Sequence, residues 1–291
     1  MFKGSFVAIV TPFTRENKVD YKALGELIEF HCDNGTAGIV PCGTTGESAT
    51  LGHGEHMEII DFCVKKVKKR IKVIAGTGSN NTAEAVELTK YAEKTGADAA
   101  LLIAPYYNKP TQKGLYLHFA EIAKKTSIPL IPYNILSRTG VNIEPATFAK
   151  LFEIDNIVGV KEASGSLDQM SAILQSSPKP IYMLSGDDAL TLPLMSIGGS
   201  GVVSVVANIA PAETAQMVSM YLEGRVDEAK KMHMKLYPLV KAMFTETNPI
   251  PVKEALILMG KIKPYLRLPM CRLSEDNIPA LKVELKKFKL I

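Results

Sequence analysis

A lysine directly follows a short apolar run in the segment IVGVKEASG, residues 157–165. The run is typical of a strand buried on both faces, and Lys161 comes next. Freeing the lone pair of an ordinary lysine at pH 7 costs ~4–5 kcal/mol, and burial reduces that cost because it disfavours the charged form. Lys161 is therefore a candidate nucleophile that could form a Schiff base with a ketone. The alternative is a structural ion pair with a carboxylate such as Glu162.

Other side chains with possible chemistry also follow apolar runs. Thr44 and Thr45 lie in PCGTTGES, where glycines expose backbone N–H groups, so this segment could hold a carboxylate or phosphate, or cap a helix. Tyr133 and Arg138 lie in PYNILSRTG. A tyrosine can relay protons, and an arginine can bind a carboxylate through two hydrogen bonds.

Two pairs of residues could instead bind a metal. His53 and His56 lie in LGHGEHME, and Asp187 and Asp188 lie in SGDD. The sequence has neither an HExxH motif nor a clear set of three ligands, and acidic residues at a helix start are common caps. We therefore favour the capping interpretation of the aspartates and expect no metal.

The elements that must position these residues are visible as a regular alternation. Eight short Val/Ile-rich runs, each closed by Gly, Pro, Asn or Ser, predict buried strands that begin near residues 6, 37, 72, 99, 128, 157, 181 and 201. Amphipathic segments with helix start and stop signals, such as residues 20–35 and 80–96, separate them. Eight such units in about 210 residues predict a closed (β/α)8 TIM barrel, in which strand ends and their loops form the active face.

The pattern changes after residue 211. The remainder reads as helices alone, at roughly residues 212–223, 226–245, 251–260 and 274–288. We expect residues 1–211 to form the barrel and residues 212–291 to form a helical region packed on it.

Composition restricts the classes of partner. The chain has 291 residues and a net charge of +4, and its densest basic stretch, residues 64–70, has apolar residues at helical spacing, which predicts a solvated helix face. We therefore expect no nucleic-acid binding. No apolar run approaches the ~20 residues of a membrane helix, and no signal peptide is evident. The four cysteines form no CxxC pair, and a cytoplasmic location is expected.

Several motifs in order along the whole chain carry a family likeness: GSFVAIVTPF, GTTGES, APYYNKP, SRTG, GVKEASG, SGDD, GGSGVVSVVAN and NPIPVKEAL. On these motifs the chain resembles the dihydrodipicolinate synthases, also called 4-hydroxy-tetrahydrodipicolinate synthases. These belong to the pyruvate-dependent, Schiff-base class I aldolase family that includes N-acetylneuraminate lyase. The resemblance implies a condensation of pyruvate with L-aspartate 4-semialdehyde in lysine and diaminopimelate biosynthesis, without a metal or organic cofactor.

The resemblance also implies catalytic roles for residues at matching positions. Lys161 would be the nucleophile that forms the Schiff base with pyruvate. Tyr133 would be the proton relay, linked through Thr44 to Tyr107. Because the family supplies Tyr107 across a subunit interface, a homo-oligomer is implied, with a tetramer built as a dimer of dimers as the expected form.

Four further residues match substrate-binding positions of the family. Thr45 would hold the pyruvate carboxylate, and Arg138 would hold the carboxylate of the semialdehyde. Gly186 and Val203 would line the site through their backbones. One departure is Leu136, which stands where the family usually has proline, so we expect the loop that carries Arg138 to be less rigid.

A second set of matching positions concerns regulation. Family members that are inhibited by the end product lysine bind it at a subunit interface, and the corresponding residues here are Ser48, Ala49, Leu51, His53, His56, Asn80, Glu84 and Tyr106. We therefore expect feedback inhibition by L-lysine, with the two histidines as effector ligands.

Rival interpretations remain open. A sialic acid or keto-deoxy sugar acid lyase should lack Arg138 and the second threonine of GTTGE, both of which are present. A metal-dependent aldolase or hydrolase would use the histidine and aspartate pairs described above. A non-catalytic binding barrel would keep the lysine site alone.

Overall fold

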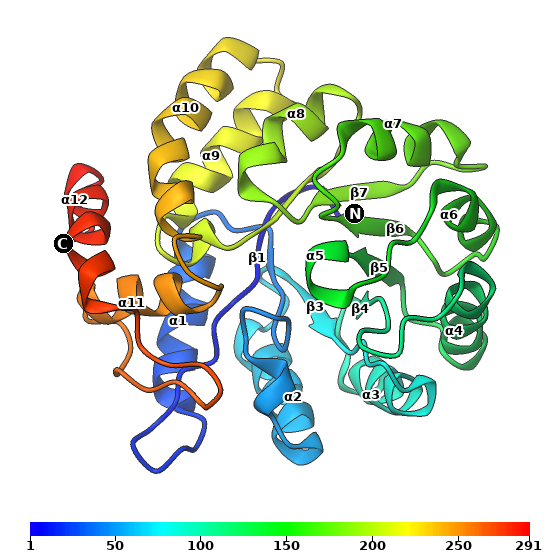
Figure 1. Ribbon diagram of the computed structural model, residues 1–291, viewed down its shortest axis with the longest axis horizontal. Helices are drawn as coiled ribbons and strands as arrows, with labels where there is room; N and C mark the ends of the chain where they lie inside the picture. The colour runs from blue at the N-terminus through cyan, green and yellow to red at the C-terminus, as the bar shows by residue number, and fades with distance from the viewer.

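The computed structural model describes residues 1–291 and contains a closed barrel of eight parallel strands in sequential order (Figure 1). The strands are β1 (Gly4–Val7), β2 (Gly38–Ile39), β3 (Lys72–Gly76), β4 (Ala99–Ile103), β5 (Leu130–Asn134), β6 (Gly159–Glu162), β7 (Tyr182–Ser185) and β8 (Gly201–Ser204). Each strand overlaps the apolar run that predicts it. The predicted TIM barrel is therefore confirmed.

Helices alternate with the strands and surround the barrel (Figure 1). Between β1 and β8 they are α1 (Tyr21–Asp33), α2 (His53–Val67), α3 (Thr82–Thr95), α4 (Gln112–Lys125), α5 (Leu136–Thr139), α6 (Pro145–Phe152), α7 (Leu167–Ser176) and α8 (Thr191–Ser196). After β8 come α9 (Pro211–Leu222), α10 (Val226–Ala242), α11 (Ile250–Leu258) and α12 (Ile278–Lys287).

Local signals explain where the helices begin and end. The side chain of Asn81 accepts a hydrogen bond from the Ala83 N–H at the start of α3, and Gly96, at φ +86°, ends the helix. Helix α2 ends at Val67 because Lys68 adopts a left-handed conformation. The last residues of the basic stretch 64–70 therefore lie beyond the helix, which differs from the expected continuous helical face.

The barrel interior is filled by apolar side chains from alternating strand positions. One buried cluster contains Phe6, Leu101, Tyr133, Leu184 and Val203 among its members, and two larger clusters lie between the barrel and its helices. Residues in register on neighbouring strands point to the same face of the sheet. A residue whose register partners on both neighbouring strands belong to this inner cluster therefore also points into the barrel.

The C-terminal helices extend the ring on one side. Helix α9 contacts β1 and α10, while α12 contacts α10 and α11 at the edge of the molecule (Figure 1). The largest buried cluster includes Val202 from β8 and Leu239 from α10, so one core crosses residue 211. The division of the chain at that residue stays a prediction. None of the helices is both long and apolar enough to cross a bilayer.

Candidate active site

Lys161 lies inside the barrel beside Tyr133. On β6 it pairs with Tyr133 of β5 and with Leu184 of β7, both of which belong to the inner cluster. Its Nζ atom lies 4.0 Å from the centroid of the Tyr133 ring. Burial lowers the pKa of Lys161 to about 7, with a further lowering by Arg138 and an opposing contribution from Asp188. A substantial fraction of this amine is therefore neutral near pH 7 and able to attack a carbonyl carbon.

Glu162, the alternative partner of this lysine, points to the opposite side of the strand. Successive side chains alternate across a strand, and Glu162 accepts hydrogen bonds from the backbone N–H of Ser164 and the side-chain amides of Asn134 and Gln169. Lys161 forms none of the ion pairs in the structure. The structural ion pair considered from the sequence is therefore excluded.

The ends of β7 and β8 close around the lysine. A Cβ atom added at Gly186 would lie 3.0 Å from Lys161 Cε and 2.7 Å from Ala163 Cβ, so only glycine fits without displacement. Val203 is buried in the same inner cluster as Tyr133. The backbone here has room for Lys161 because position 186 has no side chain.

The two aspartates of SGDD have different roles. Asp187 accepts a hydrogen bond from the Ala189 N–H at the start of a short 3-10 helix, which confirms the capping interpretation for that residue. Asp188 is buried and accepts from the Ser204 hydroxyl and the Val205 N–H, so it anchors the end of β8. No group of three or more metal-ligating side chains occurs in the chain.

Asn248 joins the two predicted carboxylate ligands. Its side-chain amide donates to Thr45 Oγ1 at 3.0 Å, and its backbone carbonyl accepts from Arg138 Nη2 at 3.0 Å. Arg138 lies on α5, the short helix that begins at Leu136. Sequence reasoning did not single out Asn248, although it opens the motif NPIPVKEAL that contributes to the family likeness.

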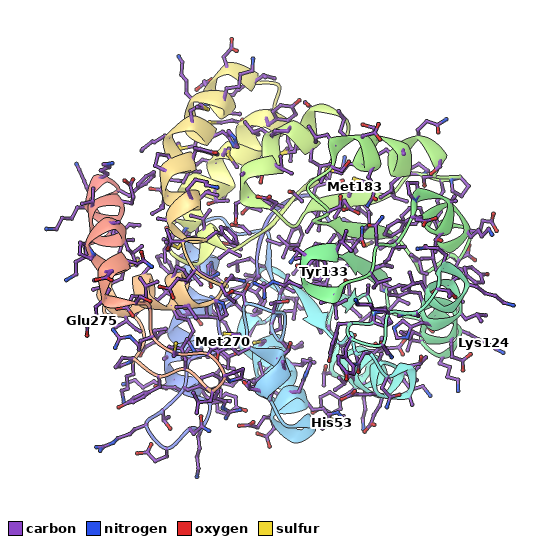
Figure 2. All side chains as sticks on the ribbon, in the orientation of Figure 1. His53, Lys124, Tyr133, Met183, Met270 and Glu275 are labelled. Carbon is purple, nitrogen blue, oxygen red and sulfur yellow. The ribbon has the colours of Figure 1, made fainter.

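One cavity of about 370 Å³ connects these groups with a second set. Thr44, Tyr133, Arg138 and Asn248 line it toward the barrel. Residues of the predicted lysine site also line it: Ser48, Ala49, Leu51, His53, His56, Glu84 and Tyr106. Figure 2 shows Tyr133 near the middle of the barrel and His53 farther out, on α2. Parts of the two predicted sites therefore share one cavity. The predicted site residues that do not line it are Lys161, Thr45, Gly186, Val203, Asn80 and Tyr107.

The outer part of this cavity carries an anionic group. The Ser79 hydroxyl and the His53 ring both contact the Glu84 carboxylate and lower its pKa, while the pKa of His53 is raised by its hydrogen bond to Glu84. His56 donates through Nε2 to the Gly76 carbonyl at 2.6 Å, and burial lowers its pKa. The site thus presents a carboxylate and a neutral imidazole beside the Tyr106 ring.

Tyr107 lies apart from the cavity in the single chain. The residue is 89% exposed, and its backbone has φ +72°, a conformation rare for residues other than glycine. Two reciprocal bonds hold its loop, from Asn80 Nδ2 to the Tyr106 carbonyl and from Asn108 Nδ2 to the Asn80 carbonyl. No hydrogen bond joins Tyr133, Thr44 and Tyr107 within this chain, so the predicted relay stays a prediction.

Comparisons with known proteins agree with this geometry. The model of the Dihydrodipicolinate synthetase family matches residues 1–288. The 4-hydroxy-tetrahydrodipicolinate synthase of Syntrophus aciditrophicus (strain SB) is 55% identical over 291 residues, which cover 100% of both chains.

Two solved structures add bound molecules. A chloride-inhibited dihydrodipicolinate synthase from Acinetobacter baumannii, complexed with pyruvate, is 44% identical, with a TM-score of 0.98 and 100% of both chains covered. The enzyme from Cyanidioschyzon merolae with lysine bound is 40% identical, with a TM-score of 0.96, and the match covers 100% of this chain and 99% of that one. On the full-length match of the family model and of these relatives, the chain belongs to the Dihydrodipicolinate synthetase family.

Proposed function

We propose that this chain is a 4-hydroxy-tetrahydrodipicolinate synthase, which condenses pyruvate with L-aspartate 4-semialdehyde. The observation that carries the proposal is the buried amine of Lys161, which has a pKa of about 7 and no carboxylate partner. Such an amine is suited to form a Schiff base. A relative that matches the chain over its full length is named 4-hydroxy-tetrahydrodipicolinate synthase.

The reaction begins at the Lys161 amine. The Nζ lone pair attacks the ketone carbon of pyruvate, water leaves, and a Schiff base forms. Loss of a proton from the methyl carbon gives an enamine, which forms a carbon–carbon bond to the aldehyde of the second substrate. The aldehyde oxygen takes up a proton. The amino group of that substrate then attacks the imine carbon, closes the ring and releases Lys161 as a free amine.

The surrounding residues are proposed to bind and to transfer protons. Tyr133, within contact of the Lys161 amine, is the proposed proton relay; burial raises its pKa, so its hydroxyl is protonated and can donate. Thr44 is proposed to link Tyr133 to Tyr107. Thr45 is proposed to hold the pyruvate carboxylate, and Arg138 the carboxylate of the semialdehyde. Arg138 is supported in this role by its position on the cavity and its bond to Asn248.

Borohydride trapping tests the proposal. Reduction in the presence of pyruvate should attach one reduced pyruvyl group to Lys161, located by peptide mass spectrometry. Lys161→Ala should remove the adduct, and an adduct that survives this substitution would contradict the assignment. Full activity in EDTA would exclude the metal-dependent alternative, and turnover of the semialdehyde in preference to sugar acids would exclude the lyases.

A second proposal concerns regulation by L-lysine. The outer part of the cavity offers the Glu84 carboxylate to an ammonium group, with His53, His56 and Tyr106 around it. A lysine-bound relative of similar structure supports the same ligand here. Isothermal titration should detect binding, and a Glu84→Gln variant should weaken it. No heat of binding at millimolar lysine would contradict the proposal.

Assembly and location complete the proposed function. The exposed Tyr107 ring is proposed to enter the site of a second subunit, within a tetramer that is a dimer of dimers. Sedimentation and a Tyr107→Phe variant test this arrangement. A cytoplasmic location is consistent with four cysteines that are all unpaired.

A further inference from the structure

The segment from Gly43 to Leu51, here called the 43–51 loop, connects the two parts of the cavity. Thr44 lines the cavity near the start of the loop, and the predicted effector residues Ser48, Ala49 and Leu51 line it near the end. Thr45, between them, is buried. Almost no regular structure holds the loop, apart from one short 3-10 helix, Ser48–Thr50. Its position must therefore be set by contacts with other parts of the chain.

A buried ion pair holds the centre of this loop. Glu47 has a left-handed backbone, and its side chain is 1% exposed. Lys253 of α11, whose side chain is 0% exposed, donates through Nζ to Glu47 Oε1 at 2.5 Å and to the Thr11 carbonyl at 3.0 Å. The second oxygen of Glu47 accepts from the backbone N–H of Arg267 at 3.3 Å. Both charged groups are thus removed from water and matched by specific hydrogen bonds.

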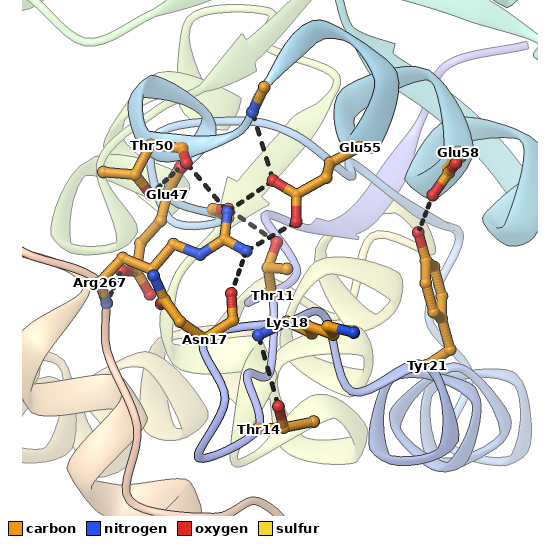
Figure 3. A network of polar contacts seen from close by, with 12 residues as sticks. Thr11, Thr14, Asn17, Lys18, Tyr21, Glu47, Thr50, Glu55, Glu58 and Arg267 are labelled. Atoms are coloured by element: carbon orange, nitrogen blue, oxygen red, sulfur yellow. Dashed lines mark hydrogen bonds and ion pairs between the residues drawn. The ribbon is translucent and has the colours of Figure 1, made fainter.

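A second layer surrounds the pair. Figure 3 shows the Arg267 guanidinium between Glu55, the Thr50 carbonyl and the Asn17 carbonyl. The Phe13 ring contacts both cations, with its centroid 4.5 Å from Lys253 Nζ and 4.3 Å from Arg267 Cζ. The bonds to Thr50 and Glu55 join the 43–51 loop and helix α2 to Arg267. The contacts with Asn17 and Phe13 connect Arg267 to the N-terminal segment.

Helix α11 and the residue Asn248 before it also reach Thr45, the proposed ligand of the pyruvate carboxylate. Asn248, just before α11, donates to Thr45 Oγ1, and Lys253 contacts Glu47 two residues farther along the loop. On the other side of the loop the Thr11 hydroxyl donates to the Gly46 carbonyl at 2.7 Å. Residues 45, 46 and 47 are therefore each held by a separate partner. A displacement at Glu47 would be transmitted directly to Thr45.

We propose that Glu47 and Lys253 are positioning residues that hold the 43–51 loop in the geometry that binds the pyruvate carboxylate. This inference rests on the proposed function. A buried ion pair usually contributes little net folding free energy relative to an apolar pair of the same size, so its stabilising role alone is weak. The pair instead fixes the position of the Glu47 side chain, because its carboxylate accepts hydrogen bonds from two donors in fixed places.

The decisive experiment separates position from stability. Lys253→Met leaves Glu47 buried without its cationic partner, whereas the double variant Glu47→Met with Lys253→Met removes both charges. Arg272→Met is the matched control, because Arg272 pairs with Glu254, the neighbour of Lys253 on α11, and its side chain forms no hydrogen bond or ion pair with the loop. KM for pyruvate, kcat, the pyruvate dependence of borohydride trapping at Lys161 and thermal unfolding are measured for all three.

We expect KM for pyruvate to rise roughly tenfold or more in both Lys253 variants, with kcat changed about twofold at most, because Lys161 and Tyr133 are on other strands. The double variant should regain thermal stability and keep the raised KM. Arg272→Met should keep the KM of the unsubstituted chain.

Four outcomes would overturn the inference. A double variant with an unchanged KM would show a purely structural pair, and failure of both Lys253 variants to fold would assign the pair to folding itself. An unchanged KM in the single variant Lys253→Met would also show that the pair is purely structural. Absence of the adduct in the unsubstituted chain would overturn the proposed function, and this inference with it.

Discussion

Lys161 and Lys253 are both buried lysines, yet their surroundings differ. Lys253 donates to the Glu47 carboxylate, and Lys161 has no carboxylate within hydrogen-bonding distance. Burial lowers the pKa of both amines, but Glu47 opposes the lowering at Lys253 through its charge and its hydrogen bond. The comparison teaches that burial creates a reactive amine where no carboxylate is hydrogen-bonded to it.

The largest expected effect is on chemistry at Lys161. Lys161→Met should reduce kcat/KM by at least ~10⁴-fold, because the covalent intermediate cannot form. Steady-state kinetics and borohydride trapping check this outcome. Lys253→Met should retain the adduct, and a loss of the adduct in both variants alike would remove the distinction between the two lysines.

The same substitution should change stability in opposite directions at the two positions. Lys161→Met should raise the free energy of unfolding at pH 7, by roughly 4 kcal/mol as an upper bound, because the unfolded amine holds its proton up to its ordinary pKa. Lys253→Met should lower it by ~3–5 kcal/mol, since Glu47 loses its partner.

Denaturant unfolding over a range of pH tests this contrast. Lys161 has a lowered folded pKa, so its destabilising effect is complete below pH 7 and declines as pH rises from about 7 toward the unfolded value of 10.5. The advantage of Lys161→Met should decline over the same range. A gain independent of pH would indicate better packing rather than removal of a charge.

The pH dependence of adduct formation gives a smaller effect. Below about pH 7 the rate of trapping should fall about tenfold per pH unit, because only the neutral amine attacks. Arg138→Met should move the midpoint upward, since this cation lowers the pKa of Lys161. A midpoint near the ordinary lysine value would mean that the site does not depress the pKa before pyruvate binds.

The smallest effect concerns the rim of the site. Leu136 is the first residue of α5, a position that accepts proline, and Ile135 before it has an extended φ of −150°. Leu136→Pro should raise the free energy of unfolding by ~0.4–1 kcal/mol through a stiffer unfolded chain, with kcat nearly unchanged. A substantial loss of activity would mean that the Arg138 loop depends on Leu136 itself.

Much of the barrel could be predicted because its signals are local. The eight apolar runs, their closing turn residues and the caps at Asn81 and Gly96 are each set by a few neighbouring residues. Lys161 and Tyr133 could be placed at strand ends for the same reason. Asn248 and Lys253 could not be connected to the site in this way, since their partners Thr45 and Glu47 lie more than 200 positions away in the sequence.

The sequence by itself determined the alternation of strands and helices, the barrel it builds and the arrival of Lys161 at the end of β6. Tertiary structure alone decided the face on which that lysine lies and therefore its chemistry. Lys161 points into the barrel because it is in register with Tyr133 and Leu184. Glu162 points outward, where it accepts hydrogen bonds from Asn134 and Gln169. The pKa of an amine depends on desolvation and on charges near it in space, which distant segments supply.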